Sequence, residues 1–319
     1  MLDSFGRTID YARISVTDRC NLRCVYCLPS DHEQGDEKSM SLDQILRVGA
    51  ALADLGFIKF KITGGEPTVR SDIVKIVKGL KNLKGVKNIT LTTNGLLLEK
   101  LAVPLVEAGL NSINISLDSL DDNYYRSLTR LGSLPRVLAG LEAAAATGLS
   151  AVKINCVPQS QTTENDILAL TNLAKEKNIH VRFIELMPIG PGASLASHSP
   201  QVVKSIIEKA YGPLTSASLS FGNGPAVYYS LKNFKGLIGF ISALHSRFCQ
   251  SCNRLRITSD GCVKTCLHMD KGRELPFEDE KALREVIIEA VKQKPERHFF
   301  ETKTKLALAD DRLMSRIGG

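Results

Sequence analysis

The feature that most constrains the fold of this chain is a repeated alternation of strand-like and helix-like segments. Runs of alternating apolar and polar residues are typical of strands. Six of them cover residues 11–16, 57–63, 88–92, 112–118, 151–157 and 180–186. Helical patterns lie between them, and three begin after plausible N-cap residues, Ser41, Ser71 and Thr163. Such a series predicts parallel strands joined by right-handed crossovers, in a barrel or in an open doubly wound sheet.

One face of these expected strands is polar, which is unusual. Parallel strands that helices cover on both sides normally read as continuous apolar runs. The polar face here comprises Arg13, Ser15, Lys59, Lys61, Thr63, Thr90, Thr92, Ser112, Asn114, Ser116, Asp118, Lys153, Asn155, His180 and Arg182. A packed core would not tolerate so many charges, so we predict an open barrel whose inner face lines a ligand cavity. An antiparallel sheet with its polar side in solvent is the alternative, and the helices between the strands argue against it.

Polar motifs follow most of these strands. A cysteine-rich loop follows the first, GGEP (64–67) the second, TNG (93–95) the third, LDS (117–119) the fourth and MPIG (187–190) the sixth. In parallel α/β folds the carboxyl ends of the strands form the ligand crevice, so these motifs predict a single site. Gly64 and Gly65 would allow the backbone to approach a ligand closely.

The first cysteine group, CNLRCVYC, contains Cys20, Cys24 and Cys27 and has no obvious fourth ligand. Structural zinc sites are closed by four ligands. Three clustered thiols therefore favour a four-iron, four-sulfur cluster whose fourth iron is free to bind a group that is not protein. A zinc site completed by His32 or by a remote cysteine is the alternative.

The second group, FCQSCNRLRITSDGCVKTC, contains Cys249, Cys252, Cys262 and Cys266. By spacing alone it also fits a four-cysteine zinc ribbon, as in nucleic-acid-binding proteins. Most of the eight cysteines fall in these two groups, which indicates metal ligands in a reducing compartment, and we expect a cytoplasmic protein. No apolar run approaches a membrane span and no signal peptide is visible, so no membrane partner is expected.

The net charge of +7 does not by itself predict a nucleic-acid partner. The lysine-rich stretch 75–87 has lysines at helical spacing beside apolar residues, which is typical of the solvated face of an amphipathic helix. We therefore expect no nucleic-acid partner.

CNLRCVYC followed by ITGGEP resembles the radical S-adenosylmethionine superfamily. The second CxxC, the following NRLR, the fourteen-residue step from Cys252 to Cys266 and the terminal IGG are similar to the GTP 3′,8-cyclases of molybdenum cofactor biosynthesis. The similarity extends from GRTIDYARISVTDRC to the end of the chain. It implies an α/β fold: a partial, open parallel β/α barrel of about six strand-helix units over residues 1–220, and a carboxyl-terminal α+β extension over 221–319 that carries a second cluster.

The resemblance also implies a reaction. S-adenosylmethionine chelates the free iron of the first cluster, and its reductive cleavage yields a 5′-deoxyadenosyl radical. This radical takes a hydrogen from the 3′ carbon of GTP, and the carbon radical attacks carbon 8 of guanine to give 3′,8-cyclo-7,8-dihydro-GTP, which makes the enzyme a lyase. The implied partners are an electron donor such as a flavodoxin, a downstream cyclic pyranopterin monophosphate synthase and a second copy of the chain in a homodimer. A radical enzyme acting on a peptide or a tRNA is the enzymatic alternative.

The family pattern assigns roles to individual residues. The first cluster is held by Cys20, Cys24 and Cys27, and the second, which faces guanine, by Cys249, Cys252 and Cys266. S-adenosylmethionine is bound by Tyr26, Gly65, Ser116 and Met187. GTP is bound by Arg13, Lys61, Thr92, Lys153, Arg254, Leu255 and Arg256, with Lys59 and Arg182 nearby. The catalytic set is Arg13, Arg254, Arg256, Gly318 and Gly319, the two glycines reaching into the active site.

The sequence shows two departures from the family pattern and leaves one alternative to it open. Cys156 and Cys262 fall outside the ligand pattern and are predicted to be core residues. Lys61 stands where the family commonly has arginine, so the charge is kept and the bidentate geometry is lost. For each cation, an internal salt bridge is the alternative to a substrate contact, and the candidate acids are Glu66, Asp118 and Glu185.

Overall fold

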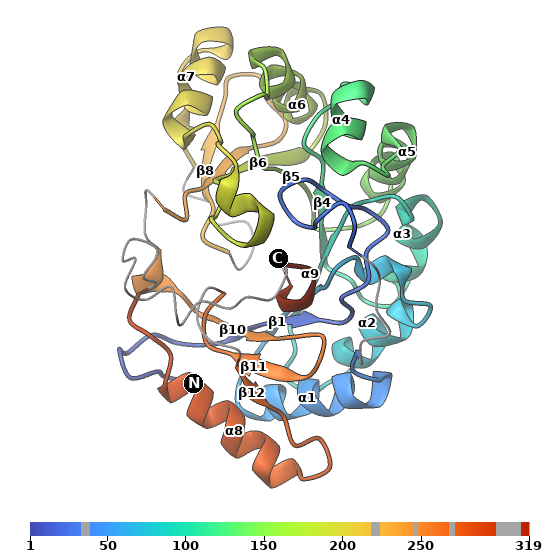
Figure 1. Ribbon diagram of the computed structural model, residues 1–319, viewed down its shortest axis with the longest axis vertical. Coiled ribbons are helices and arrows are strands. Elements are labelled where there is room, and N and C mark those ends of the chain that lie inside the picture. The colour runs from blue at the N-terminus through green and yellow to red at the C-terminus, as the bar shows by residue number, and fades with distance from the viewer. Residues whose placement is uncertain (33–38, 218–223, 245–247, 268–271, 298–313, 319) are drawn as a thin grey trace.

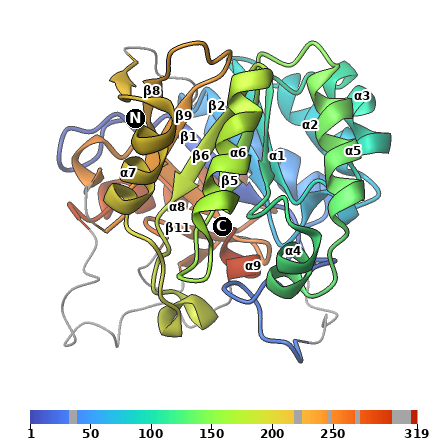
Figure 2. The ribbon, with the colours of Figure 1, turned by 90° about the horizontal axis from the view of Figure 1, so that it is seen from above.

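The strands of this protein form one open, curved sheet, which Figures 1 and 2 show from two directions. The computed structural model describes residues 1–32, 39–217, 224–244, 248–267, 272–297 and 314–318. Within these ranges the sheet has twelve strands in the order β12-β11-β10-β1-β2-β3-β4-β5-β6-β9-β8-β7. The strands are β1 (Tyr11–Ser15), β2 (Lys59–Thr63), β3 (Asn88–Thr93), β4 (Ser112–Ser116), β5 (Ala151–Cys156), β6 (Ile179–Ile184), β7 (Thr215–Ser216), β8 (Val227–Ser230), β9 (Ile238–Ile241), β10 (Arg254–Ile257), β11 (Cys262–Lys264) and β12 (Arg273–Glu274).

The strands from β10 to β9 in this order all run parallel and curve into an open barrel. Most of the longer helices lie around its outside. The helices are α1 (Leu42–Asp54), α2 (Ile73–Lys81), α3 (Leu98–Glu107), α4 (Asp122–Thr129), α5 (Leu134–Ala145), α6 (Glu164–Glu176), α7 (Pro200–Tyr211), α8 (Glu280–Lys292) and α9 (Met314–Ile317), with short 3-10 turns η1 (Pro67–Val69), η2 (Gly190–Ser194) and η3 (Cys249–Ser251). The predicted partial parallel β/α barrel is confirmed.

Two of the three predicted N-caps are correct. Ser41 and Thr163 each accept a hydrogen bond from the third residue of the helix, whose side chain bonds back, so both α1 and α6 begin with a capping box. The prediction of Ser71 is wrong, because α2 begins after Asp72. The Asp72 carboxylate forms an ion pair with Arg70 instead of capping the helix.

The apolar face of each central strand packs against the helices and forms the hydrophobic core. This cluster includes Ile14, Phe60, Leu91, Ile115 and Ile154, all fully buried. Burying one such side chain contributes about 1.5–3 kcal/mol, so the core holds the barrel strands in fixed register. Cys156 lies in this core, as predicted.

The polar face of the same strands points to the other side of the sheet, and the strand register aligns its residues in rows. Arg13 of β1 is paired with Arg256 of β10 on one side and with Lys61 of β2 on the other. Lys153 of β5 lies beside His180 of β6 in a second row. Since side chains alternate along a strand and the helices cover the apolar face, this polar face is the inner face of the barrel, as the sequence predicted.

The carboxyl-terminal part of the chain joins both edges of the barrel. β10 pairs in parallel with β1, and β9 pairs in parallel with β6. β7 and β8, on either side of the expected boundary at residue 220, pair with each other as an antiparallel hairpin. α8 packs against α1 and β11 on the outside. Among the described residues, no helix has the length and apolar character needed to cross a membrane.

The end of the chain lies within the ring of strands. α9 occupies the middle of the barrel in the view of Figure 1. Ile317 is almost fully buried, and the Gly318 backbone lies against Ser15 and Thr63 of the inner face. Gly319 lies outside the described residues.

Candidate functional site

The first cysteine group lies in the loop that follows β1, and hydrogen bonds hold it in a compact turn. The backbone amide of Cys27 donates to the carbonyl of Cys24 at 2.9 Å, and the amide of Leu22 donates to Cys20 Sγ at 3.4 Å. The GGEP loop after β2 is bonded to the start of this loop, since the amide of Gly65 donates to the carbonyl of Thr17 at 2.7 Å. The cysteine loop and the GGEP motif are therefore neighbours in the structure.

The end of α4 holds the same cysteine loop from another side. The amides of Arg23 and Val25 donate to carbonyls at the end of α4, at 3.1 and 2.9 Å. Arg130 follows this helix with φ of 63°, a conformation that non-glycine residues rarely adopt. Its Nη1 donates to the carbonyls of Arg23 and Leu28, both at 3.0 Å, so Arg130 spans the loop on either side of two cysteines.

The chemistry of the first group fits an iron-sulfur cluster. Burial, and then the repulsion between neighbouring thiolates, raises the pKa of Cys27 to about 12. The same two causes, in the same order, raise the pKa of Cys24 well above its usual range. Three thiolates held together in this way need a nearby positive charge, which the iron of a cluster supplies. Among the described residues, no group of three or more His, Cys, Asp or Glu side chains is arranged to hold a metal ion.

The residues assigned to S-adenosylmethionine lie around this loop. Gly65 packs so tightly on the carbonyls of residues 18 and 19 that a Cβ atom has no room there. A Cβ at Gly192 would lie 3.2 Å from the carbonyl of Tyr26 and 3.1 Å from that of Met187, so the turn at Gly192 brings these two segments together. Ser116 is the last residue of β4.

Asp118 is a further member of this site, which the sequence placed in the LDS motif and among the candidate acids without a role toward the cofactor. Tyr26 donates its hydroxyl proton to Asp118 Oδ2 at 2.7 Å, and the amide of Val157 donates to Oδ1 at 2.8 Å. Burial raises the pKa of Asp118 to about 6. The signal was its place directly after a strand, in LDS. The aspartate fixes the orientation of Tyr26.

Cations of the inner face influence one another electrostatically. Burial and then the charge of Arg182 lower the pKa of Lys153 to about 8. Burial, followed by the charges of Arg13, Arg182 and other cations, lowers the pKa of Lys61 well below its usual range. His180 is held neutral, because burial and then the charges of Lys153 and Arg182 lower its pKa to about 4. The structure therefore gathers the cations predicted for substrate binding.

The carboxylates that were the alternative partners of these cations are otherwise engaged. Glu66 accepts hydrogen bonds from Thr93 Oγ1 at 2.6 Å and from the amide of Asn94 at 2.6 Å. Glu185 accepts one from a backbone amide at 2.7 Å. Within the described part of the chain, Lys61 and Lys153 form no ion pair with a carboxylate.

The remaining residues assigned to GTP differ in their surroundings. Thr92 accepts a hydrogen bond from Asn114 at 3.2 Å on the inner face. Lys59 is paired with Asp10 at 2.8 Å. The Leu255 side chain is fully buried in the hydrophobic core, so only the backbone of this residue is available for a substrate contact.

The second cysteine group lies on both sides of β10: Cys249 and Cys252 precede this strand, Cys262 begins β11 and Cys266 follows β11. Burial would raise the pKa of Cys252, but the charges of Arg254 and Lys294 outweigh it and lower this pKa to about 7. The guanidinium of Arg254 lies over the ring of Phe248, 4.8 Å from its centroid. Cys262 is buried in β11, where it pairs with Glu274, in agreement with the predicted core position. Thiolates beside buried cations suit a second iron-sulfur cluster.

The carboxyl-terminal tail, α9 with Gly318, contacts β1, β2 and β10 on the inner face of the barrel. Arg256 Nη1 donates to the carbonyl of Gly318, and the Gly318 backbone lies against Thr63 and Ser15. Gly318 has φ of +73°, which favours glycine. The end of the chain is therefore anchored on the row of cations.

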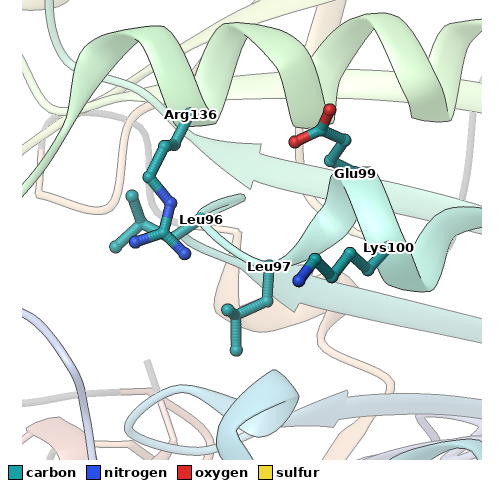
Figure 3. A pocket seen from close by; sticks show the side chains of 5 residues that line it. All are labelled: Leu96, Leu97, Glu99, Lys100 and Arg136. Atoms are coloured by element: carbon teal, nitrogen blue, oxygen red, sulfur yellow. The ribbon is translucent and has the colours of Figure 1, made fainter.

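A separate depression lies outside the barrel, between the start of α3 and α5. Figure 3 shows the side chains that line it, which are Leu96, Leu97, Glu99, Lys100 and Arg136. None of them belongs to the predicted site, and both apolar and charged side chains contribute to it.

The class of protein follows from comparison with known families. The model of the radical SAM superfamily matches residues 14–174, and the model described as Molybdenum Cofactor Synthesis C matches residues 179–300. The structure of Streptococcus suis SuiB bound to S-adenosylmethionine resembles this one in fold, with a TM-score of 0.64, 17% identity and coverage of 86% of this chain and 65% of that chain. This chain is a member of the radical SAM superfamily, whose enzymes use a four-iron cluster and S-adenosylmethionine.

Full-length relatives define the family more narrowly. The GTP 3′,8-cyclase of Clostridium perfringens (strain 13 / Type A) is 43% identical over 326 residues, covering 100% of both chains. That of Desulforamulus reducens is 40% identical over 329 residues, again with 100% of both chains covered. The chain belongs to the GTP 3′,8-cyclase family. This membership favours two iron-sulfur clusters over the zinc-ribbon alternative.

Proposed function

We propose that this chain is a lyase that converts GTP to 3′,8-cyclo-7,8-dihydro-GTP, the first step of molybdenum cofactor biosynthesis. The observation that carries the proposal is the gathering of cations on the inner face, between the two cysteine groups. Among the described residues, Lys61 and Lys153 form no ion pair with a carboxylate. Like charges gathered in this way repel one another, and a polyanion relieves this repulsion. A nucleoside triphosphate brings the required charge, which a peptide substrate need not carry.

The cysteine groups would hold the two clusters. In this proposal Cys20, Cys24 and Cys27 hold the first and Cys249, Cys252 and Cys266 the second. The first cluster with bound S-adenosylmethionine supplies the radical that abstracts hydrogen. Tyr26, Gly65, Ser116 and Met187 bind and orient this cofactor, and Asp118 holds the Tyr26 ring through its hydroxyl group.

The inner-face cations would orient GTP. Arg13, Lys61, Lys153, Arg254 and Arg256 bind the triphosphate and sugar, each charge-assisted hydrogen bond contributing about 1.5–3 kcal/mol. In addition, Thr92 and the backbone of Leu255 contact the nucleotide. Arg254 and Arg256 are two residues apart on β10, which points both side chains to the same face.

Gly318 and Gly319 would complete the cavity. The carbonyl of Gly318 orients Arg256, and glycine lacks a side chain that would occupy substrate volume. In this proposal the protein acts in the cytoplasm. A flavodoxin-type donor reduces the first cluster, a cyclic pyranopterin monophosphate synthase consumes the product, and the chain works as a homodimer.

The test is anaerobic incubation of the reconstituted protein with dithionite, S-adenosylmethionine and GTP, followed by mass analysis of the nucleotide. We expect 5′-deoxyadenosine and a cyclised nucleotide in equal amounts. Formation of 5′-deoxyadenosine with unchanged GTP would support the radical chemistry but refute GTP as the substrate. Cys24→Ser should abolish both products, whereas Cys266→Ser should leave some deoxyadenosine.

A further inference from the structure

A buried arginine near the N-terminus connects three segments that are distant in sequence. Arg7 is 9% exposed, and its Nε donates to Asp3 at 2.6 Å. Nη1 donates to the carbonyl of Cys249 at 2.8 Å and to that of Glu296 at 2.9 Å. Nη2 donates to the carbonyl of Pro295 at 2.7 Å. One guanidinium therefore holds the second cysteine group and the segment after α8 against the N-terminal segment.

The charge of Arg7 is balanced within this arrangement. Asp3 is its ion-pair partner, and the carboxylate also accepts hydrogen bonds at 2.9 Å from the amides of Phe5 and Arg7. The aspartate side chain is completely buried. The Asp3–Arg7 pair therefore needs no further anion and acts as a neutral fastener.

The segment that Arg7 holds carries a second buried cation, whose charge is not balanced in this way. Lys294 is 4% exposed, and its Nζ donates to the carbonyl of Thr265 at 2.6 Å, next to Cys266. No ion pair joins Lys294 to a carboxylate in the ranges that the structure describes. Burial lowers the pKa of Lys294, and the ionised sulfurs of Cys252 and Cys266 act in the opposite direction, which indicates attraction between this ammonium and the thiolates. A buried ammonium without an anion costs several kcal/mol, so thiolates are the anions that fit it.

We propose that Lys294 is a positioning residue that balances the negative charge of the second cysteine group, and that Arg7 holds it in place. This inference rests on the proposed function in one respect, that the second group binds an iron-sulfur cluster. Net charge and hydrogen bonding around a cluster set its reduction potential. A fixed positive charge beside the thiolates stabilises the reduced cluster and raises its potential.

The first test separates the charge of Lys294 from its hydrogen bond. Lys294→Met removes both, Lys294→Gln keeps a donor without the charge, and Lys294→Arg keeps the charge. The full chain is reconstituted anaerobically without GTP, and the reduction potential of each cluster is measured by titration followed by electron paramagnetic resonance. We expect a lower potential for the second cluster in the Met and Gln variants, a value near the wild type in the Arg variant, and an unchanged first cluster in all three.

Other outcomes would overturn the inference. A wild-type potential in Lys294→Gln would show that the lysine is only a hydrogen-bond donor. Equal shifts of both clusters would indicate a general change of fold. If the wild-type protein binds about four iron atoms instead of about eight, it holds no second cluster, and the inference is refuted whether or not GTP is converted.

The second test concerns Arg7. Arg7→Lys keeps the charge for Asp3 but cannot reach the three carbonyls with a planar group. Iron should leave the second site several-fold faster in the presence of a chelator, while the first site is unaffected. Lys177→Met, which removes a half-buried lysine paired with Glu142, is the control and should match the wild type. If Arg7→Lys loses iron at the wild-type rate, Arg7 does not hold the second site in place and this part of the inference is refuted.

Discussion

Replacing Gly318 with alanine tests whether the docked tail is part of the working site. Gly318 has φ of +73°, and a Cβ atom there would lie 2.8 Å from Thr63 Cγ2 and 3.2 Å from Ser15 Cβ. The first distance is shorter than carbon atoms tolerate, so the tail has to move. Moving it separates the Gly318 carbonyl from Arg256.

The size of the effect follows from these contacts. An alanine in the left-handed conformation costs about 1–2 kcal/mol. Losing a hydrogen bond to a charged group costs about 1.5–3 kcal/mol. Together they amount to about 2.5–5 kcal/mol, which is roughly a 60- to 4,000-fold shift toward the undocked tail.

The assay is the rate of nucleotide cyclisation by the anaerobic enzyme, with iron content and thermal melting measured on the same preparation. Gly318→Ala should lose most of the cyclisation rate while iron content and melting temperature stay at the wild-type values. Gly148→Ala is the matched control, because no atom lies within 4 Å of its added Cβ. It should behave as the wild type.

Two results would refute this reasoning. Gly318→Ala with the wild-type rate would show that the tail is a bystander. A comparable loss in Gly148→Ala would show that the effect is not local. A fall in iron content in Gly318→Ala would instead place the tail among the supports of a cluster.

Three further predictions concern other parts of the fold. The pKa of Lys153 is lowered to about 8, so GTP affinity measured by calorimetry should fall as the pH rises through 8, and Lys153→Met should lose this dependence. In the ligand-free protein the unfolded lysine keeps its proton to higher pH, so the free energy of unfolding should rise above pH 8. Arg130→Gly should relieve the strain of the positive φ, so the melting temperature should not fall. Because the variant lacks the hydrogen bonds to the carbonyls of Arg23 and Leu28, the first site should lose iron faster. Ser41→Ala removes a capping box and should cost about 1 kcal/mol in urea unfolding without affecting activity.

The barrel was predictable because its pattern is local. The alternation of polar and apolar residues within each of the six strands determines which side chains face the helices, and this needs no knowledge of distant segments. Ser41 and Thr163 were predictable for the same reason, since a capping box lies within four residues. The prediction of Ser71 failed because α2 begins one residue later, after Asp72, whose carboxylate is paired with Arg70.

The edges of the sheet and the supports of the second cysteine group were not predictable. β9 and β10 have four residues each, and their parallel pairing with β6 and β1 depends on contacts across the whole chain. The bond from Arg7 to the carbonyl of Cys249 spans 242 residues. It involves a backbone atom, so no feature of the cysteine motif signals it.

The cations on the inner face connect stability with ligand binding. Lys61 and Lys153 are held close to other cations, although carboxylates such as Glu66 lie in the same fold and bond elsewhere. The ligand-free protein therefore carries an electrostatic cost that the hydrophobic core has to offset. A polyanion that binds only the folded state removes this cost and adds its own binding energy. In the proposed function, the arrangement that weakens the empty barrel is also the one that would give a triphosphate its affinity.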